Sequence, residues 1–322
     1  MPLRPHQIDA LDAMANNPKG QVIVPTGGGK TMCMIEDAKR VFRTQEIATI
    51  VVVAPRILLA QQLCSEFMET GEFPDVHVLH VHSGETEYNS TTKVDQIRLH
   101  NFMCYETDSH QIIFTTYHSL HRVQESDIVI DVVYFDEAHN SVQRNFFPAV
   151  EHLATLVADR CFFFTATPKH STTVERPGMN NEKVYGKVII NVPAPKLVKE
   201  GHILPPKVII KKIDVVDDSR FKHEHDCDHV ISTIDDVDTD KILICARSTK
   251  QIVNLVAQSK LVDELSWRGY SWMYITAKTG AIIDGEKVSR EEFFNVLNVS
   301  KNFSLLTFFP LITAPVLAVI YM

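Results

Sequence analysis

A glycine-rich segment near the N-terminus has the residue types of a phosphate-binding loop. Residues 24–31 read VPTGGGKT, after an apolar run at 21–24 and before a stretch of helical spacing. Consecutive glycines let backbone N–H groups approach phosphate oxygens, and a helix N-terminus adds partial positive charge. Lys30 would reach the β- and γ-phosphates of a nucleoside triphosphate, and the Thr31 hydroxyl would ligate Mg²⁺. Valine stands at position 24, where the general pattern begins with glycine. The predicted cofactor-binding set here is Thr26, Gly27, Gly28, Gly29, Lys30 and Thr31.

Two adjacent carboxylates end an apolar run further along the chain. The segment 132–139 reads VVYFDEAH, so Asp136 and Glu137 follow a predicted buried strand. Asp136 would hold Mg²⁺, and Glu137 would polarise an attacking water as a general base. His139 is placed on the γ-phosphate side, where it would sense whether the γ-phosphate is present and transmit that nucleotide state to the rest of the protein. An acidic strand end alone is often only solvated, but this one follows the phosphate loop in chain order. The predicted catalytic residues are Lys30, Asp136, Glu137 and His139, and the predicted metal ligands are Thr31 and Asp136.

The residues between and around these motifs predict the scaffold that positions them. Short β-branched runs alternate with helical patterns, and the run ATIVVVA at 48–54 is continuously apolar, as in a strand buried on both faces. Alternation of this kind is typical of βαβ units and predicts an α/β fold with parallel sheets. Strands are expected at 21–24, 48–54, 76–81, 111–115, 128–135 and 161–165, with helices at 31–42, 57–68 and 145–158.

Composition excludes several classes of protein. The chain has 322 residues, of which 45% are hydrophobic and 22% charged, so extensive disorder and low-complexity architecture are excluded. A net charge of −8 excludes a uniformly basic nucleic-acid coat but leaves room for a local basic groove. Six cysteines occur without a C-x-x-C pair, and the N-terminus lacks the apolar core of a secretory signal. These features indicate reduced thiols and a cytoplasmic location.

Taken together, the motifs resemble those of superfamily-two helicases of the DEAD/DEAH-like kind. The resemblance covers about residues 3–300 and is strongest to the restriction-type translocase branch common in phages and large viruses, which would place the protein in the host cytoplasm. The segments that carry it are LRPHQ (3–7, the adenine-recognition element), VPTGGGKT (24–31, motif I), VVVAPRILLAQQ (51–62, Ia), FTTYHS (114–119, Ic), FDEAH (135–139, II), FTATP (164–168, III) and KILICARSTKQI (241–252, IV).

The resemblance implies an ATPase stimulated by nucleic acid, with two RecA-like parallel-sheet lobes of the P-loop NTPase type. ATP with Mg²⁺ would bind in the cleft, and a strand of DNA, favoured over RNA, would cross both lobes. Gln7 would read the adenine edge, with Arg4 near it. The chain would hydrolyse ATP to move on DNA or to unwind it. Residues implied to touch the nucleic-acid backbone are Pro55, Arg56, Thr115, Thr116 and Arg247, and residues implied to couple ATP state to lobe movement are Thr165 and Thr167.

The sequence departs from the helicase pattern in its second lobe. Neither motif V nor the motif VI string Q-x-x-G-R-x-x-R occurs, and the arginines beyond Ile242, at 247, 268 and 290, have a different context. The missing arginine finger contributes about 10³–10⁵ to turnover in related ATPases. The alternative function is therefore a catalytically impaired remnant that binds ATP and nucleic acid, or half of a split motor whose finger comes from a second chain.

Domain boundaries follow from these motifs and from changes in composition. Residues 1–210 are expected to form the ATP-binding domain, 211–240 an acidic connection, and 241–322 a partial second RecA-like domain. The tail 303–322 has no charged residue. A shifted or truncated reading frame is the favoured explanation, ahead of a strand packed on the second lobe and of a membrane segment. Within the connection, His223, His225, Cys227 and His229 would alternate on one face of a strand as metal ligands, although a solvated acidic linker is favoured.

Overall fold

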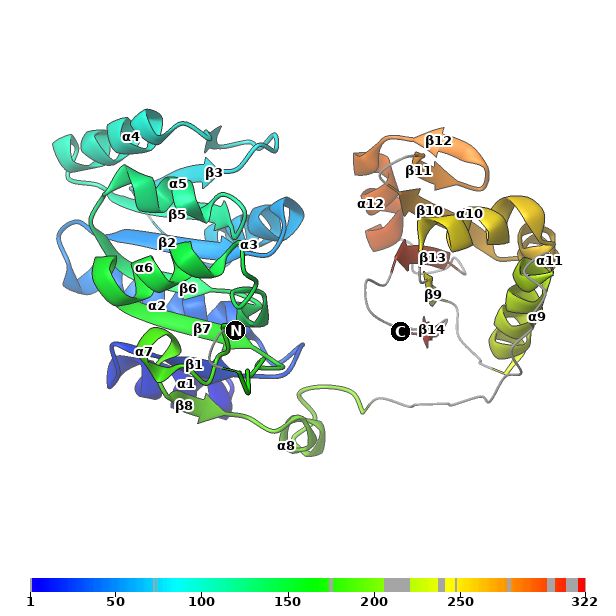
Figure 1. Ribbon diagram of the computed structural model, residues 1–322, viewed down its shortest axis with the longest axis horizontal. Helices are drawn as coiled ribbons and strands as arrows, with labels where there is room; N and C mark the ends of the chain where they lie inside the picture. Colours follow the sequence, from blue (N-terminus) through cyan, green and yellow to red (C-terminus); the bar gives the residue numbers. More distant parts are fainter. Residues whose placement is uncertain are drawn as a thin grey trace. The chain divides into compact units, whose positions relative to one another are not determined.

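The chain divides into two compact units, Met1–Lys207 and Val208–Met322, in the computed structural model. The structure describes residues 2–71, 73, 75–173, 176–205, 221–236, 241–246, 248–276, 279–299, 305–310 and 318–321. Each unit is built on its own sheet, and Figure 1 shows the strands of the first unit stacked in the order β3, β5, β2, β6, β7, β1 and β8.

The first unit contains an eight-stranded sheet whose order, β4-β3-β5-β2-β6-β7-β1-β8, requires a crossover between most neighbours. Every pairing in it is parallel, which confirms the predicted α/β fold. The strands are β1 (Lys19–Ile23), β2 (Thr49–Ala54), β3 (Val76–Val81), β4 (Asn89–Ser90), β5 (His110–Thr116), β6 (Ile130–Phe135), β7 (Ala158–Thr165) and β8 (Val188–Asn191).

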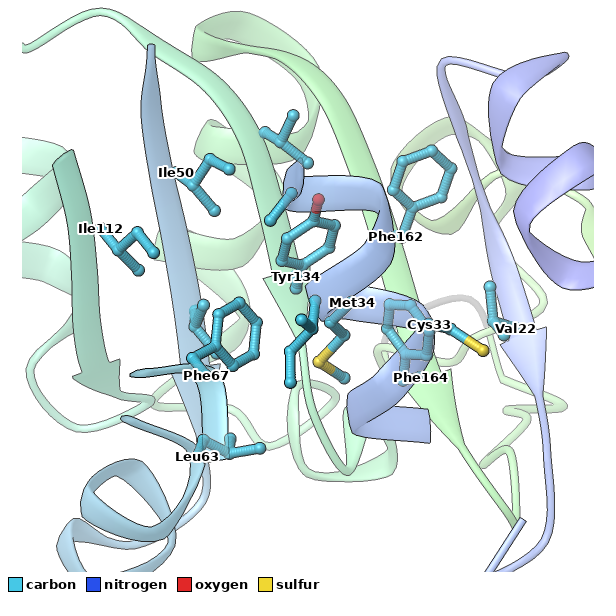
Figure 2. Packing of buried hydrophobic residues seen from close by; sticks show 14 of the residues in the cluster. Val22, Cys33, Met34, Ile50, Leu63, Phe67, Ile112, Tyr134, Phe162 and Phe164 are labelled. Atoms are coloured by element: carbon cyan, nitrogen blue, oxygen red, sulfur yellow. The ribbon is translucent and has the colours of Figure 1, made fainter. Parts of the chain in front are cut away.

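Helices cover both faces of this sheet because alternate strand residues point to opposite sides. On one face, Ile50, Phe162 and neighbouring side chains pack against residues of α1, α2 and α3 (Figure 2). On the other face, Val51 and Phe163 pack against α4 to α7. The helices are α1 (Pro5–Ala15), α2 (Lys30–Thr44), α3 (Ile57–Gly71), α4 (Val94–Glu106), α5 (Leu120–Ser126), α6 (Phe147–His152), α7 (Glu182–Tyr185) and α8 (Ala194–Lys199), with a 3₁₀ turn, η1 (Ala138–Asn140), and a π-turn, η2 (Leu153–Val157).

Local signals explain where the observed elements differ from the predicted ones. The helix expected at 145–158 is α6 followed by η2, and Pro148 occupies its first turn. Ahead of β8, residues 182–185 form the short helix α7, because the Asn181 side chain caps the Lys183 N–H and Gly186 ends the helix at a φ of 65°. Residues 211–220 and 237–240 of the predicted connection lie outside the described residues.

The second unit has a smaller, six-stranded sheet in the order β12-β11-β10-β13-β9-β14. Its centre is parallel, since β13 pairs in parallel with both β10 and β9, while the outer pairings are antiparallel. The elements are α9 (Lys222–Asp235), β9 (Lys241–Ala246), α10 (Thr249–Gln258), α11 (Leu261–Trp267), β10 (Ser271–Thr276), β11 (Gly280–Ile283), β12 (Glu286–Val288), α12 (Arg290–Val299), β13 (Leu305–Pro310) and β14 (Ala318–Tyr321).

The acidic segment expected as a connection contains α9, a helix of the second unit. Its buried side chains recur at helical spacing, at Cys227, Val230, Ile231 and Ile234, and they join the core of that unit. The arrangement of four ligands on one strand face is therefore wrong. Cys227 points into the core, whereas His225 and His229 lie one helical turn apart, with 3.2 Å between their Nε2 atoms.

The described parts of the uncharged tail are strands. β13 lies between β10 and β9, and β14 pairs with β9, which is the second of the three explanations considered for residues 303–322. Within the part of the chain that the structure describes, no helix combines the length and apolarity needed to cross a membrane.

Candidate active site

Glycine is required at three successive positions of the loop between β1 and α2. Gly27 and Gly29 have φ angles of 75° and 82°, in the left-handed region that side chains disfavour. A Cβ on Gly28 would lie 2.9 Å from the carbonyl oxygen of Pro25. Gly29 is the N-cap of α2, so the loop leads directly into a helix N-terminus with its partial positive charge.

The start of α1 holds the outer side of this loop through three consecutive carbonyl groups. Arg4 Nη1 donates to Gly27 O over 3.2 Å, and Gln7 Nε2 donates to Gly29 O over 3.2 Å. Between them, His6 Nε2 lies 2.7 Å from Gly28 O. In a trans peptide the C=O and the following N–H point in opposite directions. These contacts therefore aim the N–H groups that follow Gly28 and Gly29 toward the opposite side of the loop.

His6 was not singled out by the motif analysis, although it stands inside the segment LRPHQ. Gln7, predicted to read an adenine, is buried, and both ends of its amide are engaged within the chain. Its Oε1 accepts a hydrogen bond from Arg4 N at 2.8 Å, while its Nε2 donates to Gly29 O. The structure thus places Gln7 and Arg4 on the phosphate loop itself, and adenine recognition by Gln7 stays a prediction.

The predicted catalytic side chains meet where β1, β6 and β7 end side by side. Lys30 Nζ lies 3.4 Å from Glu137 Oε1, and Glu137 Oε2 lies 3.4 Å from His139 Nδ1. His139 Nδ1 is in turn 3.0 Å from Thr165 Oγ1 at the end of β7. The strand order β6-β7-β1 brings these residues together, since parallel neighbours end at the same edge of the sheet. Glu137 adopts a left-handed φ of 44° at this edge.

Asp136 and Glu137 form a locally negative site that suits a divalent cation. Burial and the neighbouring charge of Glu137 raise the pKa of Asp136 to about 6, whereas Lys30 acts in the opposite direction. A bound dication would offset the repulsion between the two carboxylates. The oxygen donors predicted for Mg²⁺, on Thr31 and Asp136, are of the kind that this ion prefers.

The contacts of His139 fit a neutral imidazole with its proton on Nδ1. Burial lowers the pKa of His139, with Lys169 and Lys30 adding to the effect and Glu137 opposing it. A proton on Nδ1 can be shared between Glu137 and Thr165, while Nε2 accepts from Asn140 Nδ2 at 3.3 Å.

The two threonines predicted to couple ATP state to movement lie at the end of β7. Thr165 is buried, and its Oγ1 accepts from the N–H of the exposed Thr167 at 3.1 Å. The Thr165 carbonyl accepts from Val24 N at 3.1 Å, so this residue contacts both the phosphate-loop strand and His139. Their coupling role stays a prediction.

Four of the residues predicted to touch a nucleic-acid backbone lie at the carboxyl ends of the neighbouring parallel strands β2 and β5, where Ala54 pairs with Thr116. Arg56 is exposed and Pro55 half-buried at the start of α3. Thr115 and Thr116 are buried, and the Thr115 hydroxyl donates to Val81 O at 2.9 Å. In this conformation neither threonine side chain is exposed for the predicted contact, because both serve the interior of the sheet.

Arg247 lies outside the described residues. A cavity of about 690 Å³ lies elsewhere in the first unit, lined by α6 and the segment 171–181 among others, and none of the predicted site residues lines it.

Residues 1–170, more than half of the chain, match the family described as "Type III restriction enzyme, res subunit". Two solved structures resemble the chain in fold. The ATP-dependent type ISP restriction-modification enzyme LlaBIII, bound to DNA, is 15% identical with a TM-score of 0.69, over 96% of this chain and 24% of LlaBIII. A nuclease-deletion mutant of the type ISP enzyme LlaGI, in complex with a DNA substrate mimic, is 20% identical with a TM-score of 0.53, over 73% of this chain and 22% of LlaGI.

The chain therefore spans less than a quarter of the length of these two enzymes, and at such identities the likeness is one of fold. No curated protein matches the chain in sequence.

Proposed function

The chain belongs to the family of the type III restriction enzyme res subunit, and from that premise we propose that it is a DNA-dependent ATPase that hydrolyses ATP with Mg²⁺ to move on DNA or to unwind it. The observation that carries the proposal is the continuous chain of contacts from Lys30 through Glu137 and His139 to Thr165. It joins the phosphate loop, the acidic strand end and the end of β7 in a single site.

Nucleotide binding would use the loop and the start of α2. The contacts of the residues at the start of α1 with the loop carbonyl groups orient the N–H groups of Gly29 and Lys30. These N–H groups would donate to phosphate oxygens, and Lys30 Nζ would balance the phosphate charge. Thr31 and Asp136 would hold Mg²⁺, which when bound neutralises charge on the β- and γ-phosphate oxygens.

Glu137 is the residue we assign as general base. Its Oε1 lies 3.4 Å from Lys30 Nζ, so the carboxylate is engaged in an ion pair. A triphosphate would draw Lys30 toward its own oxygens, and Glu137, still held by His139, would then be free to accept a proton from water. His139 and Thr165 would transmit this change of partner to the end of β7.

DNA as the nucleic acid is supported by the fold neighbours, since LlaBIII was solved bound to DNA and LlaGI with a DNA substrate mimic. On this chain, the exposed Arg56 at the start of α3 would supply a phosphate contact.

A second candidate function is ATP and DNA binding with slow turnover unless another chain supplies an arginine finger. Arg268, in the second unit, is already held by its own neighbours. Its Nε and Nη2 contact Asp235 at 2.8 and 3.1 Å, and its Nη1 lies 2.6 Å from Glu264 Oε2. An arginine fixed in this way is a poor donor to a phosphate.

The experiment that tests both candidates is ATP turnover at low salt, with and without DNA, because phosphate contacts weaken steeply as salt rises. The variant Lys30→Ala removes the phosphate contact. Lys39→Ala is the matched control, since Lys39 lies on the same helix and, among the described residues, its ion pair is with Glu36, 2.9 Å away. Turnover stimulated by DNA and lost only in Lys30→Ala supports the first candidate. Nucleotide binding without turnover supports the second, and equal nucleotide affinity in wild type and Lys30→Ala contradicts both.

A further inference from the structure

Three side chains with metal-ligand chemistry meet at β3 and α4, and four strands lie between β3 and β1 with its phosphate loop in the sheet order. They are His77, His100 and Cys104. One nitrogen from each histidine and the sulfur of Cys104 all lie within 4.8 Å of one another. No motif marks the three in the sequence, and the site described above does not use them.

The fold fixes how these residues meet. His77 on β3 is paired in register with Gln111 on β5, so both side chains lie on the same face of the sheet. α4 packs on that face, and its residues 100 and 104 are one helical turn apart. Cys104 Sγ lies 3.8 Å from His100 Nδ1, so the thiol lies beside the imidazole ring.

Hydrogen bonds set the protonation of His100 in the form that binds metals. Gln111 Nε2 donates to Thr49 Oγ1 at 2.9 Å, which turns Gln111 Oε1 toward His100 Nδ1 at 3.1 Å. His100 Nδ1 then carries the proton, and Nε2 has a free lone pair. That Nε2 atom is buried with no hydrogen-bond partner among the described residues. A histidine that donates through one nitrogen and is open at the other is the arrangement typical of a metal ligand.

We propose that His77, His100 and Cys104 bind a Zn²⁺ ion, with water as the fourth ligand. Two imidazoles and a thiolate favour zinc over Mg²⁺ or Ca²⁺, which prefer oxygen. Cys104 is buried and His77 exposed, so the site reaches the surface on one side and has access for an ion and a water. Bound zinc ties α4 to β3, two elements at the edge of the parallel sheet.

The test is Co²⁺ binding to the full chain after metal removal, because a cobalt–thiolate bond gives a near-ultraviolet charge-transfer band. The wild type is expected to show this band together with the visible bands of tetrahedral Co²⁺, and Zn²⁺ should displace both. Cys104→Ser removes the thiolate and should abolish the charge-transfer band. His77→Ala changes an exposed residue, so it should fold normally and bind Co²⁺ at least tenfold more weakly. Gln111→Leu leaves the ligands in place and should weaken binding about ten- to a hundredfold while the band persists.

Matched controls separate this site from other histidines and cysteines. Cys64→Ser changes another buried cysteine, and His118→Ala another exposed histidine, and both should behave as wild type. Absence of the band in the wild type overturns the proposal, as does a band that survives Cys104→Ser. Unchanged affinity in His77→Ala overturns it too, and this variant decides the matter should Cys104→Ser fail to fold.

Discussion

Helix α2 carries two charged side chains whose surroundings differ sharply. Lys30, at its start, faces Glu137 over 3.4 Å at the partly exposed edge of the sheet. Asp37, two turns later, is completely buried and accepts from Tyr134 Oη at 2.7 Å and from Arg160 Nη2 at 3.0 Å. Both networks join α2 to β6 and β7. The first has a partner that a phosphate can replace, whereas in the second Tyr134 is completely buried and Arg160 is half-buried.

Under the proposed function, the first network serves chemistry and the second serves stability. Arg160 also donates to Met14 O at 3.1 Å and lies over the ring of Phe162, 4.9 Å from its centroid. Asp37 and Arg160 thus hold together α1, α2, β6 and β7. The phosphate loop leads directly into α2, and the residues that contact its carbonyl groups lie at the start of α1. Substitutions in the first network should therefore lower turnover, and substitutions in the second should lower the free energy of unfolding.

The largest expected effect is on turnover, through Glu137→Gln. The amide keeps the size of the side chain but cannot accept a proton from water, so kcat should fall by about 10²–10⁴. Nucleotide affinity should be retained or improved, because Lys30 loses its competing ion pair. Steady-state turnover and nucleotide titration measure the two quantities. A kcat within threefold of wild type would remove Glu137 from the role of general base.

The next effect is on folding, through Asp37→Ala. Removing one partner of a buried ion pair leaves the other uncompensated and costs about 3–5 kcal/mol of unfolding free energy. The turnover of the remaining folded fraction should be unchanged. Denaturant unfolding checks this result against Glu36→Ala, the adjacent residue in a partly exposed pair, which should lose less than about 1 kcal/mol. A loss equal to that of Glu36→Ala would mean that the buried network contributes no more to the free energy of unfolding than a partly exposed ion pair.

The two networks also differ in how far the sequence predicts them. Lys30, Glu137 and His139 stand in local motifs at the ends of predicted parallel strands, and parallel neighbours must end at one edge, so their meeting was predictable. Asp37 and Arg160 belong to no motif, and their pairing depends on which strands become neighbours. The same holds for the His77, His100 and Cys104 cluster, which needs the β3–β5 register.

Local composition misled the prediction of the inter-domain connection. α9 is rich in acidic residues, and this charge concealed the helical spacing of its buried apolar residues. Tertiary packing decided the outcome there, and composition gave the opposite indication. Thr115 and Thr116 were assigned to a nucleic-acid contact from the resemblance of FTTYHS to motif Ic, and both are buried within the sheet, so that role stays a prediction.

The smallest expected effect concerns pH and compares the half-buried Asp136 with the fully buried Asp37. The pKa of Asp136 is raised from 3.8 to about 6, mainly by desolvation, and among the described residues no ion pair joins it to a cation as one joins Asp37 to Arg160. A carboxyl whose pKa is raised on folding binds its proton more tightly in the native state, so its ionisation destabilises the fold. The native state should therefore lose stability through this group as pH rises from about 4 to 6, by up to about 1.4 kcal/mol per pH unit.

The measurement is denaturant unfolding of wild type and Asp136→Asn between pH 4 and 8, since the difference between the two curves isolates this carboxyl. Relative to wild type, Asp136→Asn should gain stability through that window and stay constant above it. Mg²⁺ with nucleotide needs the ionised carboxylate, so its affinity should fall about tenfold per pH unit below pH 6. Parallel stability curves would show that folding does not raise the pKa of Asp136, and the contrast between the two networks would then rest on Lys30 and Glu137 alone.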